Sequence, residues 1–310
     1  MKSVTRIQDS LHRFFDGDIW YSFKKSKVTV VAACVTAVFM LSAFAAPLIA
    51  PHTPFDPGTI DLMDASMPPA WYEDGTAKFL LGTDDQGRDI FSTILYGSRI
   101  SIFVGFASML LAMIIGISLG LISGYIGGTV EAVIMRIADV QISFPAILTA
   151  MLIYGVAFSL LPNERHEDLV VWVLVLAIGL SNWVNFARTV RGSTLVEKNK
   201  EYVQAARVIG RRRTTIMFRH ILPNVMGPVL VIATIGLAIA ILTEATLSFL
   251  GVGIPPTKPS LGTLIRIGQD FLFAGEWWIV IFPGIALAVL VLAVNLLGDW
   301  LRDALNPKLR

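Results

Sequence analysis

The chain alternates between long apolar runs and shorter polar segments. Six apolar runs are long enough to cross the roughly 30 Å hydrocarbon core of a bilayer as helices. They begin near Val28, Ser98, Ile137, Leu169, Val225 and Trp277 and end near Ala50, Tyr125, Leu161, Ala187, Gly251 and Leu301. The pattern predicts an all-α membrane protein with six transmembrane helices.

Two local patterns refine the predicted helices. Pro145, Pro228 and Pro283 lie in the third, fifth and sixth runs and predict kinks, whose freed backbone groups need partners in a protein interior. Small residues recur at every fourth position of the second run, at Ala112, Gly116, Gly120, Gly124 and Gly128. A stripe of this kind allows close helix packing, so the second helix is expected inside the bundle or at a subunit interface.

Charge predicts the orientation. Residues 51–97 carry eight acidic and two basic side chains, whereas residues 1–27, 188–222 and 302–310 are rich in Lys and Arg. Because cytoplasmic segments carry the excess of basic residues, 1–27 and 302–310 are predicted as cytoplasmic tails and 51–97 as an extracytoplasmic loop. Residues 28–50 form the first helix, and 98–301 form a five-helix core with a cytoplasmic loop at 188–222.

Composition agrees with a membrane protein, since 55% of residues are hydrophobic, 15% are charged and the mean hydropathy is +0.68. The net charge of +2 gives no overall basic excess for binding nucleic acid. A cleaved signal peptide is the alternative for the first run, because "SAFAAP" contains an Ala-x-Ala pattern. The polar leader of 27 residues and the length of the run favour a retained helix.

The densest charge lies in "EYVQAARVIGRRRTTIMFRHILPN", from Glu201 to Asn224. A helix here would place Val203, Ala206, Val208 and Ile209 with Gly210 on a small apolar surface. Gly210 can end or bend that helix before Arg211, Arg212 and Arg213. The pattern predicts a short helix, a glycine break and a second helical piece, a shape suited to docking. Alternatively, the arginines only fix the topology.

"QAARVIG", nine residues and then "HILP" resemble the EAA loop of permease subunits of binding-protein-dependent ABC importers. Ala205, Ala206, Gly210, Leu222 and Pro223 match its pattern, whereas Gln204 and His220 depart from it. Five further segments resemble the dipeptide, oligopeptide and nickel group of these permeases. They are "LLGTDDQGRDIFS", "YGSRIS", "RHILPN", "LSFLGVG" and "NLLGDWLRDALNPKLR". Members often show Trp-Gly where this chain has Leu261 and Gly262, so no role of that tryptophan is carried over.

The resemblance implies an ABC-importer permease bundle in a bacterial cytoplasmic (inner) membrane. Ala205, Ala206 and Gly210 would belong to a coupling helix lodged in a groove of a cytoplasmic ATPase, and Arg211, Arg212 and Arg213 would contact the ATPase or fix topology. The implied partners are a second homologous permease, two ATP-binding cassette subunits and an extracytoplasmic substrate-binding protein, for which 51–97 is a candidate contact surface.

Polar side chains within the apolar runs are candidates for a translocation path. Glu244, beside Thr243 in the fifth run, is the strongest, because an ionisable group at such depth usually faces a cavity or a partner. A structural hydrogen bond to the neighbouring permease is the alternative. Asn185 in the fourth run could line the path or join helices. Near the start of the third run, Arg136 and Asp139 are spaced to pair with each other.

No catalytic, cofactor or metal site is expected. The chain has no G-x-x-x-x-G-K-[ST] loop, so ATP would be bound by the partner subunits. The four histidines have no metal-ligand spacing, and "DDQGRD" lacks the oxygen ligands of a calcium loop, which makes it a structured turn before the second helix.

The expected function is import of di- or oligopeptides by alternating access, as a permease subunit and not an enzyme. Import of nickel or another small solute is a second possibility. A self-sufficient secondary transporter or channel, or a structural scaffold, is a third. The chain lacks the paired interrupted segments typical of secondary transporters.

Overall fold

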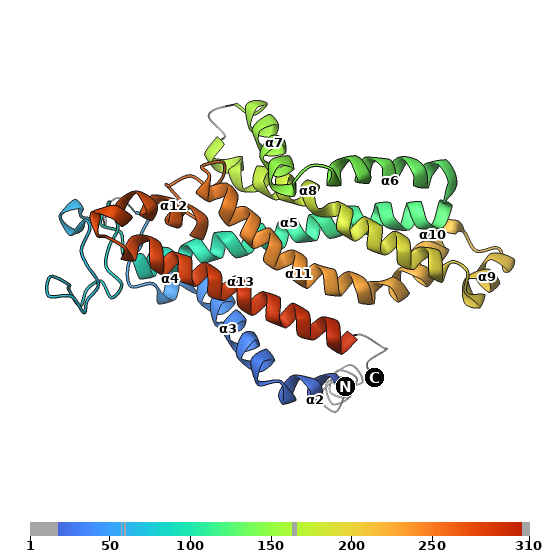
Figure 1. Cartoon of the computed structure of the whole chain (residues 1–310), viewed down its shortest axis with the longest axis horizontal. Helices are drawn as coiled ribbons and strands as arrows, with labels where there is room; N and C mark the ends of the chain where they lie inside the picture. Colours follow the sequence, from blue (N-terminus) through green and yellow to red (C-terminus); the bar gives the residue numbers. More distant parts are fainter. Residues whose placement is uncertain (1–17, 57, 59, 163–165, 306–310) are drawn as a thin grey trace, which may run out of the picture.

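Residues 18–56, 58, 60–162 and 166–305 are described by a computed structural model (Figure 1). Most of both predicted tails therefore lies outside the described residues. Among these residues, five helices are long and apolar enough to cross a membrane. They are α3 (Lys27–Phe44), α5 (Ile90–Ile126), α8 (His166–Glu197), α11 (Leu222–Phe249) and α13 (Trp278–Leu305). Within the described part of the chain the regular secondary structure is helical, apart from one isolated bridge between Thr83 and Asp89, which confirms the all-α prediction.

The third apolar run is predicted as one kinked helix, but the structure shows two separate helices. It forms α6 (Gly128–Ile142) and α7 (Ala146–Ser159), which meet at 98°. The run begins earlier than predicted because Gly127 and Gly128, with φ of +75° and +61°, turn the chain directly from α5 into α6. Pro145 then ends α6, since the residue before a proline is disfavoured in helix. The bundle has six spans if α6 and α7 act as one broken span.

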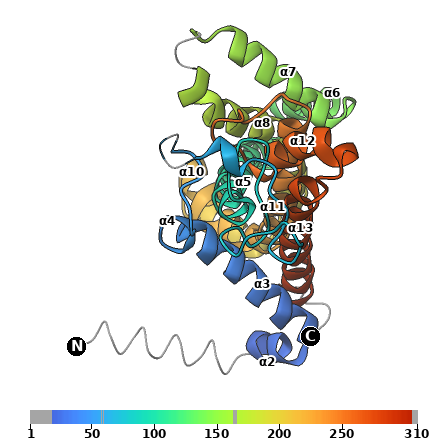
Figure 2. The same ribbon diagram turned by 90° about the vertical axis from the view of Figure 1, so that its left-hand side faces the viewer.

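α5 lies at the centre of the bundle when the molecule is viewed from the end that holds residues 51–89 (Figure 2). Its glycines pack directly on α8. A Cβ added to Gly116 would lie 2.3 Å from the Cβ of Phe186, and one added to Gly120 would lie 2.6 Å from the carbonyl oxygen of Ala187. The predicted small-residue stripe is therefore confirmed as a contact inside the bundle at Gly116, Gly120 and Gly124, whereas Gly128 begins α6 with open space around its Cβ position.

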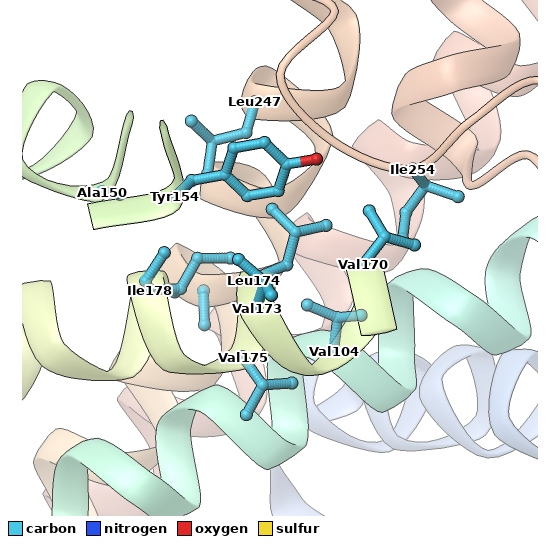
Figure 3. Close-up of a cluster of buried hydrophobic side chains, with 12 residues drawn as sticks. Val104, Ala150, Tyr154, Val170, Val173, Leu174, Val175, Ile178, Leu247 and Ile254 are labelled. Atoms are coloured by element: carbon cyan, nitrogen blue, oxygen red, sulfur yellow. The ribbon is translucent and has the colours of Figure 1, made fainter. Parts of the chain in front are cut away.

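α7 is held on the bundle by apolar side chains. Ala150 and Tyr154 of α7 lie over Leu174 and Ile178 of α8, with Leu247 of α11 beside them (Figure 3). All five side chains are buried. The packing fixes α7 across α8, even though α7 is bent away from α6.

Shorter elements complete the fold. They are α2 (Asp18–Lys25), α4 (Ala46–Ile49), η1 (Leu62–Asp64), α9 (Glu201–Val208), α10 (Arg213–Thr215), the π-helix η3 (Ile216–Ile221), α12 (Leu261–Phe271) and η4 (Leu272–Ala274). The sequence prediction missed α12, which buries Leu261 and Leu264 against α11 and α13. Ser260 caps its start by accepting a hydrogen bond from the Thr263 amide.

The described residues between 60 and 89 are held together by side-chain hydrogen bonds. The Asp84 carboxylate accepts hydrogen bonds from the amides of Gln86 and Arg88 and pairs with the Arg88 guanidinium at 2.6 Å, all within a buried turn. Arg88 also donates to the Pro256 carbonyl over 3.1 Å, which attaches the segment to the connection between α11 and α12. Asp89 then caps α5. The predicted turn before the second helix is confirmed.

Residues 51–89 and α9 lie at opposite ends of the long axis (Figure 1). α12 lies at the end that holds residues 51–89, and α10 lies beside α9. The polar segment and the charged loop therefore occupy opposite faces of the bundle.

Candidate functional site

The segment from Glu201 to Ile221 has the predicted order of a short helix, a glycine break and a second helical piece. α9 ends at Val208, and Gly210 has φ of +76°, a left-handed conformation that favours glycine. No atom lies within 4 Å of a Cβ placed on Gly210. Glycine is therefore required here by the backbone turn and not by close approach within the chain.

α9 has two distinct apolar faces. Val203 and Ala206 are buried in a core cluster with Ile216 and Ile221 of η3. Ala205, Val208 and Ile209 are exposed on the other side, with Val208 88% and Ile209 74% exposed. The prediction of one surface made by Val203, Ala206, Val208 and Ile209 is wrong, because the helical period places 203 and 206 on one face and 205, 208 and 209 on another.

A hydrogen-bonded link joins α9 to two long helices. The Tyr202 hydroxyl donates to the carboxylate of Glu197 at the end of α8 and accepts from the Asn224 side-chain amide of α11. Lys200 pairs with the same carboxylate at 2.6 Å. Burial, with the neighbouring Glu197 carboxylate, raises the pKa of Tyr202 to about 12, so the hydroxyl keeps its proton at neutral pH.

The sequence reasoning missed this Tyr202 link. Its members lie at helix ends, and Glu197 and Asn224 are 27 positions apart in the sequence. Only the tertiary fold brings their side chains to one hydroxyl. The sequence shows polar residues at both ends of the charged loop. This pattern does not specify which of their side chains form hydrogen bonds with each other.

Three arginines surround a hollow of about 420 Å³ at the base of α9. Arg207, Arg211 and Arg213 line it together with Tyr125, Ile126 and Ile216. The Arg207 guanidinium lies over the Tyr125 ring, 5.2 Å from its centroid. Arg212, predicted with its neighbours as one cluster, is exposed and is not among these lining residues.

α6 is joined to α8 by two ion pairs at the same end of the bundle. Asp139 pairs with Arg188, and Glu131 pairs with Arg191. The expected pair between Arg136 and Asp139 is wrong, because the Asp139 carboxylate is turned toward α8. Lys198 adds a hydrogen bond to the carbonyl oxygen of Gly124 over 2.8 Å.

Asn185 lies in a second hollow, of about 360 Å³, between α8 and α11. The lining combines the amides of Asn182 and Asn185, the hydroxyl of Thr189 and the guanidinium of Arg188 with apolar side chains that include Ile235 and Ile239. Thr243, one turn beyond Ile239, donates its hydroxyl to the Ile239 carbonyl over 2.7 Å. Of the three predicted path residues, only Asn185 is among the lining residues.

Glu244 is fully buried in a different place. Its carboxylate accepts hydrogen bonds from Ser101 of α5 at 2.7 Å and Ser248 at 2.8 Å. Ser101 in turn accepts from the Leu261 amide at the start of α12. Glu244 therefore connects three helices within its own chain, and this arrangement favours a structural hydrogen-bonding role over the predicted role in the path.

The described residues contain no group of three or more His, Cys, Asp or Glu side chains placed to hold a metal ion.

At the end of the bundle opposite α9, burial and then the neighbouring Asp84 carboxylate raise the pKa of Asp85. Its Oδ1 atom is buried without a hydrogen-bond partner.

Comparisons with known proteins identify the family of the chain. Residues 116–310 match the family described as "Binding-protein-dependent transport system inner membrane component", and residues 14–69 match the "N-terminal TM domain of oligopeptide transport permease C". The dipeptide transport system permease protein DppC of Haemophilus influenzae is 40% identical, over 94% of this chain and 95% of its own length. The oligopeptide transport system permease protein OppC of Bacillus subtilis is 37% identical, over 94% of this chain and 90% of its own.

Among solved structures, an inward-facing conformation of the MetNI methionine ABC transporter has a TM-score of 0.54 at 17% identity, covering 69% of this chain and 96% of that chain. At this identity the match shows a shared fold. The family predicted from the sequence is confirmed. This chain is a multi-pass inner-membrane permease subunit that belongs to the binding-protein-dependent transport system inner membrane component family.

Proposed function

We propose that this chain is one permease subunit of an ATP-driven importer of di- or oligopeptides. It pairs with a second homologous permease and two ATP-binding cassette subunits, and it receives substrate from an extracytoplasmic binding protein. The names of the relatives that match over nearly their whole length support the peptide substrate. ATP is bound by the partner subunits, because this chain has no phosphate-binding loop.

The outward face of α9 carries the coupling proposal. Ala205, Val208 and Ile209 form a small apolar surface that the described chain leaves uncovered at one end of the bundle. Ala206 supports this surface from the opposite, buried face, and Gly210 provides the turn that presents it. We assign the ATPase contact to this outward face.

Movement of α9 reaches the membrane through two contacts. The buried face packs on η3, which leads directly into α11, and the Tyr202 link attaches α9 to the ends of α8 and α11. When ATP draws the two ATPases together, displacement of α9 therefore acts on the two helices that border the Asn185 hollow. This provides a route from ATP binding to alternating access.

The Asn185 hollow is assigned to the translocation path. A peptide has a polar backbone and variable side chains. Amide groups on a mostly apolar wall, with the charge of Arg188 paired to Asp139, suit weak, sequence-independent contact. Thr243 lies one turn from this wall and is a secondary member. Segment 51–97, whose described residues lie at the opposite end from α9, is assigned to the extracytoplasmic side as the contact surface for the binding protein.

Co-purification tests the proposal. The full chain is purified from its native membrane in mild detergent, and the co-purifying proteins are identified by mass spectrometry. We expect a second permease and an ATPase with a phosphate-binding loop, and we expect Val208→Asp with Ile209→Asp to lose the ATPase. Phe273→Asp is the matched control, because Phe273 is an apolar side chain 96% exposed in η4 at the other end of the bundle.

Replacement of Gly210 by asparagine tests whether a side chain at this position disturbs the ATPase contact without straining the backbone turn. Asparagine tolerates positive φ, so Gly210→Asn keeps the turn and adds a side chain at the coupling surface. Gly275→Asn is its control, since Gly275 also has positive φ and open space around its Cβ position.

Purification of the wild-type chain alone, as a stable homo-oligomer, would contradict the importer proposal and favour a self-sufficient transporter or channel. Retention of the ATPase by Val208→Asp with Ile209→Asp would contradict the assigned surface.

A further inference from the structure

A hollow of about 580 Å³ lies at the end of the bundle that holds residues 51–89, between the end of α3, the first half of α5 and the start of α8. Most of its lining is apolar or aromatic and comprises Phe44, Phe55, Tyr96, Ile100, Phe103 and Val171. Arg99 and Lys258 complete the lining of this Arg99 hollow, and no carboxylate is among the described residues that line it. We propose that the Arg99 hollow binds an anionic phospholipid, with the phosphate at the two cations and an acyl chain along α5.

The uncharged stretch of α8 locates the membrane. α8 carries no charged residue between Asp168 and Arg188. At the helical rise of 1.5 Å per residue this stretch is about 28 Å long, close to the roughly 30 Å of bilayer hydrocarbon. Asp168 and Arg188 therefore mark the two edges of the hydrocarbon, and the pair of Arg188 with Asp139 lies at the edge nearer α9. Val171, about one turn inside Asp168, places the Arg99 hollow at the other edge.

Contacts between α5 and α8 place Arg99 at the same edge. The rings of Phe103 and Trp172 lie edge to face with centroids 5.8 Å apart. The contact of Gly116 with α8 lies further along both helices, which therefore run in the same direction. Arg99, one turn before Phe103, thus lies at the level of Asp168. Arg99 is the single charged residue of α5, so the hydrocarbon along α5 begins just after it.

Both cations are available to an anion from outside the chain. Arg99 and Lys258 are exposed, and no ion pair or side-chain hydrogen bond joins either of them to another described residue, Asp168 included. A guanidinium binds phosphate oxygens through parallel hydrogen bonds, and an ammonium binds phosphate as a point charge. Because no carboxylate of the described lining could receive a cationic headgroup, the hollow favours an anionic phospholipid over a zwitterionic one.

An apolar face of α5 continues from the hollow into the membrane. Three apolar side chains follow Arg99 at helical spacing and are exposed, namely Phe103 by 45%, Phe106 by 50% and Leu110 by 38%. This face extends about 16 Å from Arg99, which matches the roughly 15 Å of hydrocarbon in one leaflet. Trp172 of α8, exposed beside Phe103, adds aromatic surface of the kind enriched at membrane interfaces. One acyl chain can therefore lie along α5 while its phosphate contacts Arg99.

A lipid suits the hollow better than a helix of another subunit. An apolar transmembrane helix supplies no anion at this level, and burial of two unpaired cations against it would be costly. The Arg99 hollow also shares no lining residue with the Asn185 hollow, which α8 and α11 border and which we assign to the path. α3, which contributes Phe44 to one wall, runs along the outside of the bundle (Figure 2). The Arg99 hollow is therefore placed to open toward the bilayer.

Contacts within the chain hold the walls of the hollow in place. The rings of Phe55 and Tyr96 lie edge to face with centroids 5.5 Å apart. Lys258 belongs to the connection between α11 and α12, which Arg88 fixes through the carbonyl of Pro256. Walls formed in advance reduce the ordering cost of binding. A bound phosphate would join α5 to this connection.

Lipid binding is measured on the purified full chain by native mass spectrometry in a neutral detergent, with phosphatidylglycerol or phosphatidylcholine added. For the wild type we expect one retained phosphatidylglycerol at concentrations where phosphatidylcholine is not retained. Arg99→Gln with Lys258→Gln should bind phosphatidylglycerol about tenfold more weakly, because each basic residue near an anionic headgroup contributes separately. Phe106→Asn removes apolar surface and no charge, and should weaken binding about threefold.

Lys78→Gln with Arg266→Gln is the charge-matched control. Both residues are exposed, lie at the same end of the bundle and are absent from the lining of the hollow. We expect this control to bind phosphatidylglycerol as the wild type does. Equal weakening by the two double variants would overturn the proposal, and so would equal retention of phosphatidylcholine.

Two further outcomes would assign the hollow to another occupant. Complete displacement of the lipid by millimolar inorganic phosphate would indicate a site for a soluble anion. Unchanged lipid binding in Arg99→Gln with Lys258→Gln, together with loss of the second permease from the co-purified complex, would assign the hollow to that subunit. Lipid binding is measured without partner subunits, so its result is independent of whether the importer proposal holds.

Discussion

The side-chain amide of Asn224, at the start of α11, donates a hydrogen bond to the hydroxyl of Tyr202 in α9 over 3.1 Å. The same hydroxyl donates to Glu197 at the end of α8. One phenol oxygen therefore connects α9 to both helices that border the Asn185 hollow. A rigid contact at this position would transmit displacement of α9, whereas apolar packing alone allows sliding.

Tyr202→Phe removes the hydroxyl and keeps the ring. We expect peptide uptake by the reconstituted importer to fall about tenfold while the ATPase subunits remain bound, because losing a hydrogen bond to a charged group costs about 1.5–3 kcal/mol at the joint. The measurement compares uptake with ATP hydrolysis in proteoliposomes. Tyr21→Phe, in an exposed tyrosine of α2, is the control. Uptake that remains fully coupled in Tyr202→Phe would show that packing alone moves the helices.

The contact between α5 and α8 predicts a strong effect of one methyl group. Gly116→Ala places a Cβ 2.3 Å from that of Phe186, so the helices must separate or shift. Overpacking of this kind costs about 1–3 kcal/mol, and we expect a lower midpoint of thermal unfolding in detergent. Gly192→Ala is the matched control on α8, because nothing lies within 4 Å of its added Cβ. Equal midpoints for the two variants would contradict the close contact.

Substitution of Glu244 distinguishes the structural role from a role in the path. Glu244→Ala leaves the hydroxyls of Ser101 and Ser248 without their shared acceptor, which costs about 1–3 kcal/mol for each buried group left unsatisfied. We expect a large loss of thermal stability for Glu244→Ala, a smaller loss for Glu244→Gln and unchanged peptide affinity in Glu244→Gln. Altered affinity in a stably folded Glu244→Gln importer would restore the path role.

Replacement of Asp85 by asparagine is predicted to stabilise the folded chain in a pH-dependent way. Its folded-state pKa is raised by burial and by Asp84, so folding favours the protonated form. The stability from this preference is present below the ordinary pKa of 3.8 and is lost as the pH rises through the folded-state pKa. Asp85→Asn should therefore raise the unfolding temperature at pH 7, with a gain that shrinks as the pH falls toward 4. The exposed Asp74→Asn is the control, and a gain independent of pH would contradict the assigned cause.

Hydropathy was sufficient to predict the five long helices, because the need to satisfy backbone groups in lipid leaves few alternatives. It was insufficient for the third run, where the turn at Gly127 and Gly128 starts a helix earlier and Pro145 produces a break larger than a kink. α12 was missed because it is short and amphipathic and is defined by its packing on α11 and α13.

The candidate site was predicted in outline and not in detail. The order of helix, glycine turn and helix follows from local sequence signals at Gly210. The faces of α9 were assigned wrongly because the proposed grouping of Val203 with Val208 and Ile209 did not follow the helical period. The Asp139 to Arg188 pair and the Tyr202 link join residues far apart in sequence, so tertiary packing determines them.

The glycines of α5 have a mechanical consequence for transport. With Gly116 and Gly120 against α8, the two backbones approach closely over that stretch, and the buried side chains of Phe186 and Val190 have little room to change rotamer. α5 and α8 should therefore move as one rigid body during the transport cycle. Deformation must then be concentrated where side-chain layers can repack, which places the moving parts at α7, at α11 and at the hinge between α6 and α7.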